Sequence, residues 1–285
     1  MKIINKTLNL EELKLRPQSM IVEEAIELIH LFERKGLKFT TYQAEFGSGW
    51  GKDDIWFKRK LWEISTIVVN SAPIEGMKVL DCGGASTIFS FYLASKGCRV
   101  YTVDIDWRKQ GIVENADFVS QTMGLGMHNL KVSMTQLPYE DNYFDRVFSV
   151  CVLEHLAHKE QDKAIKEMSR VLKPGGIMAL TFDYGPFAHG GKYEDVRRLN
   201  KRIVIPSGLS ILENSDYLEN VWFGEMPGKT WGALFLTKND YPKRLLTCLR
   251  PNSRLAAFLK SDLSVIKSMI MNMLIGLGIK NDALL

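Results

Sequence analysis

The chain has 285 residues, of which 46% are hydrophobic and 25% charged, so it can fold around a substantial core. Its 37 Lys and Arg residues against 33 Asp and Glu residues leave a formal net charge of +4, without a run of like charges that would mark a nucleic-acid-binding arm. This composition excludes a wholly disordered chain and gives no support to a nucleic-acid partner.

The N-terminal part of the chain is predicted to contain two helices. Residues 20–35 place apolar side chains at helical spacing, and residues 55–69 repeat this pattern. A loop rich in glycine and aromatic residues separates the two segments and contains Tyr42. We interpret residues 1–72 as a helical cap, and we expect Tyr42 to close over a ligand bound to the domain that follows.

From residue 77 onward, short β-branched runs alternate with helical segments, which is typical of a parallel sheet built from βαβ units. We predict a Rossmann-like, doubly wound α/β domain over residues 73–240. A late pair of strands separated by a Pro-Gly turn is expected to form an antiparallel edge hairpin. The predicted strands are 78–81, 99–104, 130–133, 146–150, 177–182, 220–223 and 231–236, and the predicted helices are 88–96, 107–123, 159–172 and 193–200.

Residues 241–285 form a C-terminal tail with basic residues followed by an apolar run. That run covers about a dozen residues, against the roughly 20 needed to span a bilayer. Three readings of the tail stay open: it lies on an anionic membrane surface, it self-associates or docks on a partner subunit, or it covers its own domain.

The expected location is the cytoplasm. The first residues lack the apolar segment of a signal peptide. The four cysteines, Cys82, Cys98, Cys151 and Cys248, form no C-x-x-C pair, so neither a zinc site nor a disulfide framework is predicted, and no metal is expected. On the membrane reading of the tail, the protein would be peripheral to the membrane.

A turn of small residues follows the first predicted strand of the core. Gly83 and Gly84 come directly after an apolar strand that contains Asp81. Small residues at this point let a ligand approach the backbone, although tight strand–helix packing explains them too. A carboxylate ends the next strand about 20 residues later, where nucleotide-binding sheets hold a ribose diol. Asp104 and Asp106 both qualify, and we favour Asp104.

Five ordered segments of the chain resemble the successive motifs of the class I S-adenosylmethionine-dependent methyltransferases often called type 11. The resemblance covers residues 77–182 and rests on the order and spacing of the motifs. The segments are Val79-Leu80-Asp81-Cys82-Gly83-Gly84, Val103-Asp104-Ile105-Asp106, Leu137-Pro138-Tyr139-Glu140-Asp141-Asn142-Tyr143-Phe144-Asp145, Val152-Leu153-Glu154-His155-Leu156 and Val171-Leu172-Lys173-Pro174-Gly175-Gly176.

This resemblance implies S-adenosyl-L-methionine as cofactor. It places the methionine part at Asp81 and the two glycines, the ribose at Asp104, and the adenine between Ser133 and Met134. Cys151 would line the pocket floor beneath the transferred methyl group. In chain order, the implied cofactor-binding residues are Asp81, Gly83, Gly84, Ala85, Asp104, Ile105, Ser133, Met134, Cys151 and His155.

Two positions depart from the family pattern. The family usually has glycine at the position of Ala85, and usually has an acid near Ser133 to contact the adenine. An added methyl group reduces the room in the turn, and a neutral hydroxyl holds the adenine less strongly than a carboxylate does. These departures keep open a second reading, in which the domain is a catalytically silent binding subunit.

The segment after the fifth predicted strand is expected to face the acceptor, because ligands sit over the carboxyl ends of parallel strands. It contains Asp183, Tyr184 and His189, with His189 as the preferred general base if the acceptor must lose a proton. We predict methyl transfer, at oxygen, to a small-molecule, sugar or lipid-linked acceptor. A protein or RNA acceptor is the alternative. A nicotinamide dehydrogenase ranks lower because G-x-G-x-x-G is absent.

Overall fold

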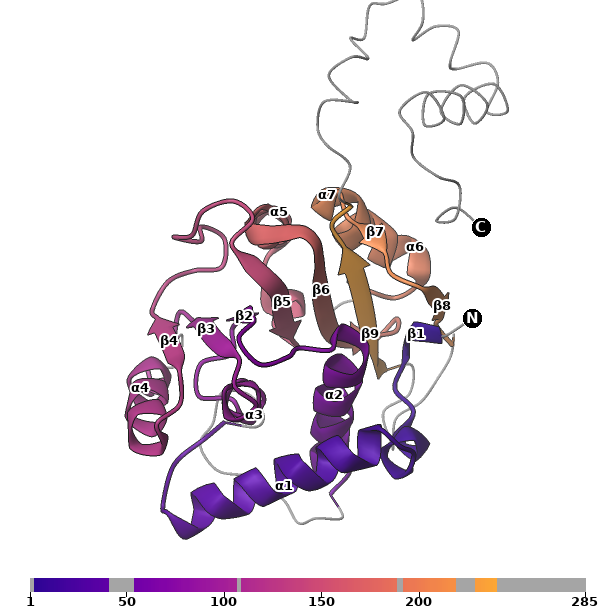
Figure 1. Ribbon diagram of the computed structural model, residues 1–285. Helices are drawn as coiled ribbons and strands as arrows, with labels where there is room; N and C mark the ends of the chain where they lie inside the picture. Colours follow the sequence, from indigo (N-terminus) through magenta and orange to yellow (C-terminus); the bar gives the residue numbers. More distant parts are fainter. Residues whose placement is uncertain (1–2, 41–53, 107–108, 189–191, 219–228, 240–285) are drawn as a thin grey trace, which may run out of the picture. The chain divides into compact units, whose positions relative to one another are not determined.

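The computed structural model describes residues 3–40, 54–106, 109–188, 192–218 and 229–239. Residues 1–239 form one compact unit, which within the described residues is built around a single sheet of nine strands. Helices cover both faces of this sheet, so the unit has three layers (Figure 1). The predicted doubly wound α/β fold is confirmed.

Five neighbouring strands of the sheet are parallel to one another. In spatial order they are β4 (Met127–Leu130), β3 (Arg99–Val103), β2 (Lys78–Cys82), β5 (Phe144–Val150) and β6 (Leu172–Tyr184). The strand order reverses between β2 and β5, and ligands in such sheets bind beyond the carboxyl ends of the strands at this switch point. The small-residue turn after Cys82 therefore lies where a ligand is expected. The strand predicted at 130–133 lies three residues earlier, at β4.

Beyond β6 the sheet becomes mixed. Strand β9 (Thr230–Thr237) pairs antiparallel with β6, as the sequence predicted for residues 231–236. It does not form the edge, because β1 (Ile3–Thr7) pairs with its other side, and β8 (Asn214–Asp216) lies parallel to β1. The short strand β7 (Ser210–Ile211) also pairs with β9. The predicted strand at 220–223 falls outside the described residues.

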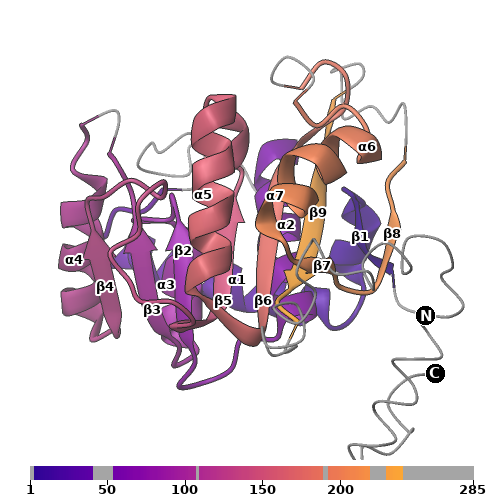
Figure 2. The ribbon, with the colours of Figure 1, turned by 90° about the horizontal axis from the view of Figure 1, so that it is seen from above.

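Seven α-helices occur among the described residues, divided between the two faces of the sheet (Figure 2). The first face carries α1 (Gln18–Arg34), α2 (Ile55–Ser71), α3 (Ile88–Ser95) and α4 (Ile112–Met123). The second carries α5 (His158–Val171), α6 (Val196–Leu199) and α7 (Ile205–Ser207). Single turns of 3-10 helix occur at Leu10–Lys14 and Leu153–His155, and a π-helical turn at Asn200–Val204.

Local sequence explains where the main helices begin and end. The side chains of Asp54 and Thr87 accept backbone N–H groups at the starts of α2 and α3, which satisfies donors that a helix start leaves unpaired. Gly36 and Gly124 adopt the left-handed backbone conformation just beyond α1 and α4. Helix α1 buries one stripe, formed by Ile21, Ala25, Ile29 and Phe32.

Each face of the sheet packs against its own apolar core. Helices α1 to α3 cover one core, which includes Phe89, Phe91 and Phe148. Helices α5 to α7 cover the other, which includes Phe182 and Tyr193. Successive side chains of a strand point to opposite faces, so odd-numbered residues of β6 face α2 and even-numbered residues face α5. This alternation decides which residues after β6 can meet in one site.

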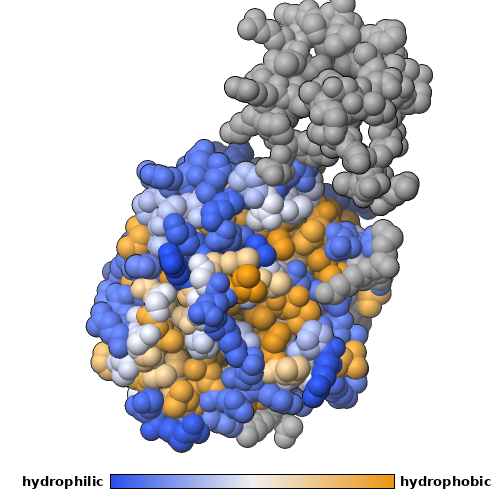
Figure 3. Space-filling model, viewed as in Figure 1, coloured by the Kyte–Doolittle hydropathy of each residue, from blue (hydrophilic) through white to orange (hydrophobic). Residues whose placement is uncertain are grey.

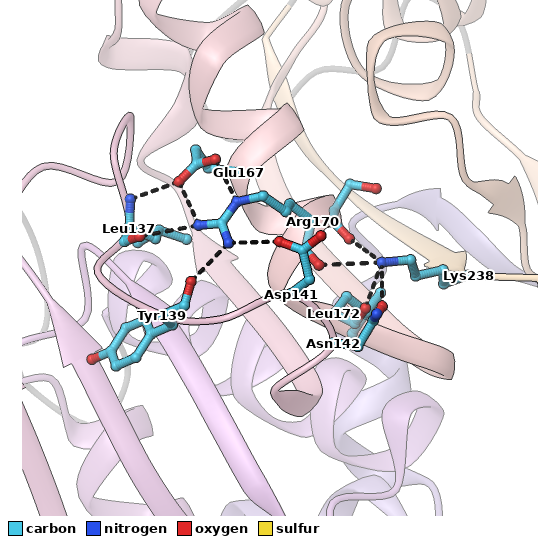
Figure 4. Close-up of polar contacts among 9 residues, drawn as sticks. Leu137, Tyr139, Asp141, Asn142, Glu167, Arg170, Leu172 and Lys238 are labelled. Carbon is cyan, nitrogen blue, oxygen red and sulfur yellow. Dashed lines mark hydrogen bonds and ion pairs between the residues drawn. The ribbon is translucent and has the colours of Figure 1, made fainter.

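Arg170, on α5, fixes the loop that precedes β5 (Figure 4). Its guanidinium donates to the carbonyl oxygens of Leu137, at 3.0 Å, and Tyr139, at 2.7 Å. It also forms ion pairs with Glu167 on the same helix and with Asp141 in the loop. A guanidinium group has five N–H donors in one plane, so it can bind several acceptors at once. The loop motif shared with the family is therefore held by α5.

Lys238, just after β9, closes the end of α5 in the same region (Figure 4). Its ammonium group donates to the carbonyl oxygens of Ser169, Arg170 and Leu172 and to the side-chain oxygen of Asn142, at 2.7 to 3.2 Å. A cation at a helix C-terminus interacts favourably with the helix dipole and satisfies its last carbonyl groups. These contacts lie at the amino ends of β5 and β6, away from the predicted ligand site.

The face seen in Figure 3 carries both hydrophilic and hydrophobic side chains, with hydrophobic ones gathered near its centre. Among the described residues, Phe187 and Ile205 are the most exposed large apolar side chains, at 74% and 73%. No helix within the described part of the chain is long and apolar enough to cross a membrane.

Candidate active site

The turn after β2 is shaped by Gly84. A Cβ atom built on this residue would lie 1.9 Å from the Oδ2 atom of Asp81, far closer than two atoms can approach. Gly83 has φ +81°, and a Cβ there would lie 2.6 Å from Val152. Neither position accepts a side chain, because the Asp81 side chain fills the space beside Gly84 and the Val152 side chain fills the space beside Gly83.

Asp81 presents an incompletely bonded carboxylate beside this turn. Its side chain is fully buried, and Oδ2 accepts a hydrogen bond from the Ser90 hydroxyl at 2.7 Å. Among the described residues, none donates a hydrogen bond to Oδ1. Burial, assisted by the charge of Asp104, raises the pKa of Asp81 to about 6, although Ser90 and the charge of Lys60 oppose this shift. A buried carboxylate oxygen without a partner is costly, and a bound cationic group would relieve that cost.

Asp104 and Asp106, which follow β3, have different hydrogen-bond partners and therefore different roles. Asp106 is 2% exposed, and its carboxylate accepts the N–H groups of Gln110 and Gly111 and pairs with Lys131 at 3.0 Å. These contacts hold the loop after β3, so Asp106 is structural. One carboxylate oxygen of Asp104 accepts a hydrogen bond from the backbone N–H of Asp106 at 2.8 Å. Burial and the nearby Asp106 charge raise the pKa of Asp104.

A surface depression of about 430 Å³ is lined by residues that follow Asp104 in the chain. Ile105 lines it and is 53% exposed. Asp106, Lys109, Gly111, Glu114 and Lys131 form the rest of its wall. An exposed apolar side chain next to a carboxylate suits a ligand with a flat ring and a neighbouring diol.

Ser133 and Ala85, the two departures from the family pattern, are both engaged inside the protein. The Ser133 hydroxyl lies 2.9 Å from that of Thr135 and accepts the Thr135 N–H, so it stabilises the turn after β4. Met134 is buried in the core near β2 and β3. Ala85 is 1% exposed and packs against Ile112 and other residues of α4. Its methyl group therefore fills a space between the turn and α4.

The thiol of Cys151, just after β5, meets a charged group from α2. It donates a hydrogen bond to Glu63 at 2.9 Å and lies 3.6 Å from the Thr181 hydroxyl on β6. Burial and the charges of Glu63 and Glu154 raise the pKa of Cys151, so it remains a thiol at neutral pH. Glu63 was not among the site residues predicted from the sequence.

Glu63 is fully buried and is held by two cations of its own helix. Arg59 lies 3.4 Å from one carboxylate oxygen and Lys60 lies 2.5 Å from the other. Burial alone would raise the pKa of Glu63, but Arg59, Lys60 and the hydrogen bond from Cys151 together lower it. The sequence signal was present, because these charges recur at helical spacing within a helix that is otherwise largely apolar.

Asp183 and Tyr184 do not share a site. Asp183 faces α2, and its carboxylate pairs with Lys229 at 2.8 Å. Tyr184 faces the other core, where its ring packs against Phe182 and Tyr217. The thiol of Cys151 and one carboxylate oxygen each of Glu154 and Asp183 lie within 4.8 Å of one another. Asp183 therefore lies beside Cys151, whereas Tyr184 points away from it.

For three other residues predicted to belong to the site, the structure gives no contact with the glycine turn or with Cys151 among the described residues. His155 is exposed and ends the single 3-10 turn after β5. Tyr42 and His189 lie outside the described residues. Thr40, two positions before Tyr42, forms a bridge with Thr87 at the start of α3, so residue 40 lies beside the end of the glycine turn.

A family model described as a methyltransferase domain matches residues 80–180, which span the glycine turn, Asp104 and Cys151. The chain carries a class I S-adenosylmethionine-dependent methyltransferase domain. The cofactor of this family is S-adenosyl-L-methionine, and the predicted family is confirmed.

Curated relatives match the same methyltransferase domain. The chain is 33% identical over 128 residues to a ubiquinone/menaquinone biosynthesis C-methyltransferase of Vibrio cholerae serotype O1, a match that covers 43% of this chain and 47% of the relative. It is also 33% identical over 138 residues to the enzyme of the same description from Shewanella sp. strain W3-18-1, covering 43% and 49%. The chain thus spans about half the length of these relatives.

Solved structures share the fold of this chain. The cyclase SpnF matches with a TM-score of 0.56 and 17% identity, over 78% of this chain and 96% of its own. A putative sarcosine dimethylglycine methyltransferase from Galdieria sulphuraria matches with a TM-score of 0.53 and 16% identity, over 76% and 99%. Because one of the two is described as a cyclase, the fold alone does not specify the reaction.

Proposed function

We propose that the protein transfers a methyl group from S-adenosyl-L-methionine to a small-molecule, sugar or lipid-linked acceptor. One observation carries the proposal: the buried, incompletely bonded carboxylate of Asp81 lies against Gly84, where no side chain fits. A site that excludes side chains and offers one carboxylate oxygen suits the ammonium group of an amino-acid moiety. When bound, the cofactor supplies an electrophilic methyl group on a sulfonium.

Three residues near the turn each bind a different part of this cofactor. Asp81 receives the ammonium group, Asp104 receives the ribose hydroxyls, and Ile105 lies against the adenine. These assignments follow from the positions of the three side chains along the carboxyl ends of β2 and β3. Because Ala85 packs against α4, it leaves the turn open and gives little support to a silent domain.

The acceptor site is proposed at the carboxyl ends of β5 and β6, on the α2 side. Cys151 and Asp183 lie there, and Asp183 is the described carboxylate best placed to accept a proton from an acceptor hydroxyl. Holding the nucleophile and the methyl group in line supplies much of the rate. Oxygen is the proposed acceptor atom, and carbon, named for the curated relatives, is the alternative. A contribution from His189 remains a prediction.

Binding of S-adenosylhomocysteine, measured by titration calorimetry, tests the cofactor site. The wild-type protein is expected to bind it with micromolar affinity, and Asp104→Ala is expected to lower the affinity by about 100-fold or more, since a hydrogen bond to a charged group contributes about 1.5–3 kcal/mol and a diol makes two. Glu114→Gln is the matched control, because Glu114 lines the same depression but its side chain is 65% exposed. Absence of binding to the wild-type protein would overturn the proposal.

The affinity for S-adenosylhomocysteine is also expected to depend on pH through Asp81. The pKa of about 6 means that the carboxylate is mostly protonated at pH 5 and ionised at pH 7. Because the ammonium group binds the ionised form, affinity is expected to rise about tenfold between these pH values. Asp81→Asn should flatten this profile. An equally steep profile in the variant would show that another group titrates.

The raised pKa of Asp81 has the opposite effect on the stability of the ligand-free protein. The folded protein binds a proton on Asp81 more tightly than the unfolded chain does, so this group favours folding at low pH. That contribution is lost as the pH rises toward about 6. A bound ammonium group would compensate the loss, so the thermal stabilisation by S-adenosylhomocysteine is expected to be larger at pH 7 than at pH 5.

A further inference from the structure

Lys192 connects the segment before α6 with the segment that follows Cys151. Its ammonium group donates hydrogen bonds to the carbonyl oxygens of Glu154 and Leu156, both at 2.7 Å. The carboxylate of Glu154 accepts the backbone N–H of Asp183 at 3.1 Å, and one of its oxygens lies within 4.8 Å of the Cys151 thiol. Glu154 therefore contacts Lys192 with its backbone and the proposed acceptor site with its side chain.

Arg202 lies against the first residue of α5. One guanidinium nitrogen is 3.2 Å from Nδ1 of His158. Arginine has no acceptor atom, so His158 accepts this hydrogen bond in its neutral form and keeps an N–H donor on Nε2. Arg202 belongs to the π-helical turn Asn200–Val204, which packs against α5 next to α7 (Figure 2). Arg202 and Lys192 thus contact the same short segment, residues 154–158.

Lys192 and Arg202 form no ion pair within the described part of the chain. The acidic side chains of the adjoining segments either have other partners or make no direct contact with these two cations; they are Glu154, Glu160, Asp162, Glu194 and Asp195. Lys192 uses two of its three N–H donors, and Arg202 uses one of five. Donors without acceptors, on cations without carboxylates, favour an anion from outside the chain.

The cations of this region also act on one another. Arg198 precedes Arg202 by about one helical turn. Burial, together with the charges of Arg202, Lys192 and Arg198, lowers the pKa of His158, although Asp162 opposes this shift. A bound anion would relieve this repulsion. The group formed by His158, Lys192, Arg198 and Arg202 is called the α6 cluster.

We propose that the α6 cluster binds a phosphate group carried by the methyl acceptor. Phosphate oxygens accept several charge-assisted hydrogen bonds at once, and the planar guanidinium of arginine matches their geometry. The acceptor would place its reactive atom near Asp183 and its phosphate against Lys192 and Arg202, because Glu154 contacts both places. The inference rests on the proposed function and narrows the acceptor to a phosphorylated small molecule or a lipid-linked phosphate.

An NMR titration of the full chain with inorganic pyrophosphate, at neutral pH and constant ionic strength, tests the cluster. The signals of His158, identified by their loss in His158→Gln, are expected to shift and saturate. Arg202→Met is expected to lower the affinity about 10-fold or more, since one charge-assisted hydrogen bond has that effect. If that variant fails to fold, Arg202→Gln replaces it. If Arg202 only joined two helices, pyrophosphate would leave the His158 signals unchanged.

Arg197→Met is the matched control. It removes the same charge from the same helix, but the Arg197 side chain is 94% exposed and lies 3.6 Å from Asp195. Its affinity for pyrophosphate should stay within about twofold of the wild type, because exposed charges are screened by salt. Unshifted His158 signals in the wild type, or an equal loss of affinity in Arg197→Met and Arg202→Met, would overturn the phosphate site.

Two further measurements identify the source of the phosphate and separate this inference from the proposed function. Flotation with vesicles of phosphatidylcholine and phosphatidic acid that requires Arg202 would assign a lipid phosphate. Pyrophosphate binding without such flotation would assign a soluble phosphorylated acceptor. A protein that binds S-adenosylhomocysteine, with His158 signals insensitive to pyrophosphate, would overturn only the phosphate site. One that binds pyrophosphate but not S-adenosylhomocysteine would overturn the proposed function, and with it the assignment to a methyl acceptor.

Discussion

Replacing Gly84 by alanine is expected to abolish measurable binding of S-adenosylmethionine and to destabilise the domain. The new Cβ atom would lie 1.9 Å from Oδ2 and 2.1 Å from Cγ of Asp81. Asp81 cannot move aside without losing its hydrogen bond to Ser90 on α3, and its side chain is fully buried. Overpacking of this kind costs about 1–3 kcal/mol of folding free energy, and it displaces the carboxylate that the cofactor requires.

Thermal denaturation and calorimetry of Gly84→Ala measure both effects. Gly126→Ala is the matched control, since a Cβ on Gly126 meets no atom within 4 Å. The control should bind the cofactor normally and change the unfolding free energy by no more than about 0.5 kcal/mol. If Gly84→Ala bound the cofactor as the wild type does, Asp81 would have to lie elsewhere, and the proposed ammonium site would be wrong.

Glu63→Ala is expected to have the largest effect on stability. The substitution leaves Arg59 and Lys60, both nearly buried, without their carboxylate, and it removes the hydrogen-bond acceptor of Cys151. Breaking a buried ion pair by removing one partner costs about 3–5 kcal/mol. Urea denaturation at neutral pH would measure the loss as a shift of the midpoint.

Two controls separate burial from charge at Glu63. Glu11→Ala removes an ion pair with Lys14 in which both side chains are more than 70% exposed, so it should change stability by less than about 1 kcal/mol. Glu63→Gln keeps the shape and the acceptor but removes the charge. Because the folded pKa of Glu63 is lowered, its charge stabilises the protein above the unfolded pKa, and this contribution is lost as the pH falls through the folded pKa. A small loss in Glu63→Ala would contradict the buried cluster.

Much of the fold could be predicted because its signals are local. The alternation of short apolar runs and helical segments gave the five parallel strands, and the turn residues gave the position of the ligand crevice. Strand β1 was not predicted, because five residues with two isoleucines carry little pattern by themselves. Its pairing depends on partners more than 200 residues away, since the Asn5 side chain donates to the carbonyl oxygen of Leu212.

The residues of the candidate site also differ in whether a local sequence pattern could select them. Asp81, Gly84 and Asp104 follow strands directly, so spacing along the sequence was sufficient to select them. Glu63 belongs to the site because α2 packs against β6 and its carboxylate accepts a hydrogen bond from Cys151. The charges at helical spacing indicate an ion pair on α2, but they do not reveal this partner at the end of another strand. The separation of Asp183 from Tyr184 was available from the sequence, because neighbouring residues of a strand point to opposite faces.

The place of β1 also has a consequence for synthesis. The Asn5 side chain accepts a hydrogen bond from the backbone of Phe235, 230 positions further along the chain. The first described strand of this unit therefore has no partner strand until β8 and β9, more than 200 residues later, have been made, while the parallel strands between them can already assemble. Pairing of two strands that are more than 200 residues apart in the chain is slow. In the cell, completion of the sheet is thus tied to the end of translation of this domain, and during that interval the free edge of β1 is exposed to other chains.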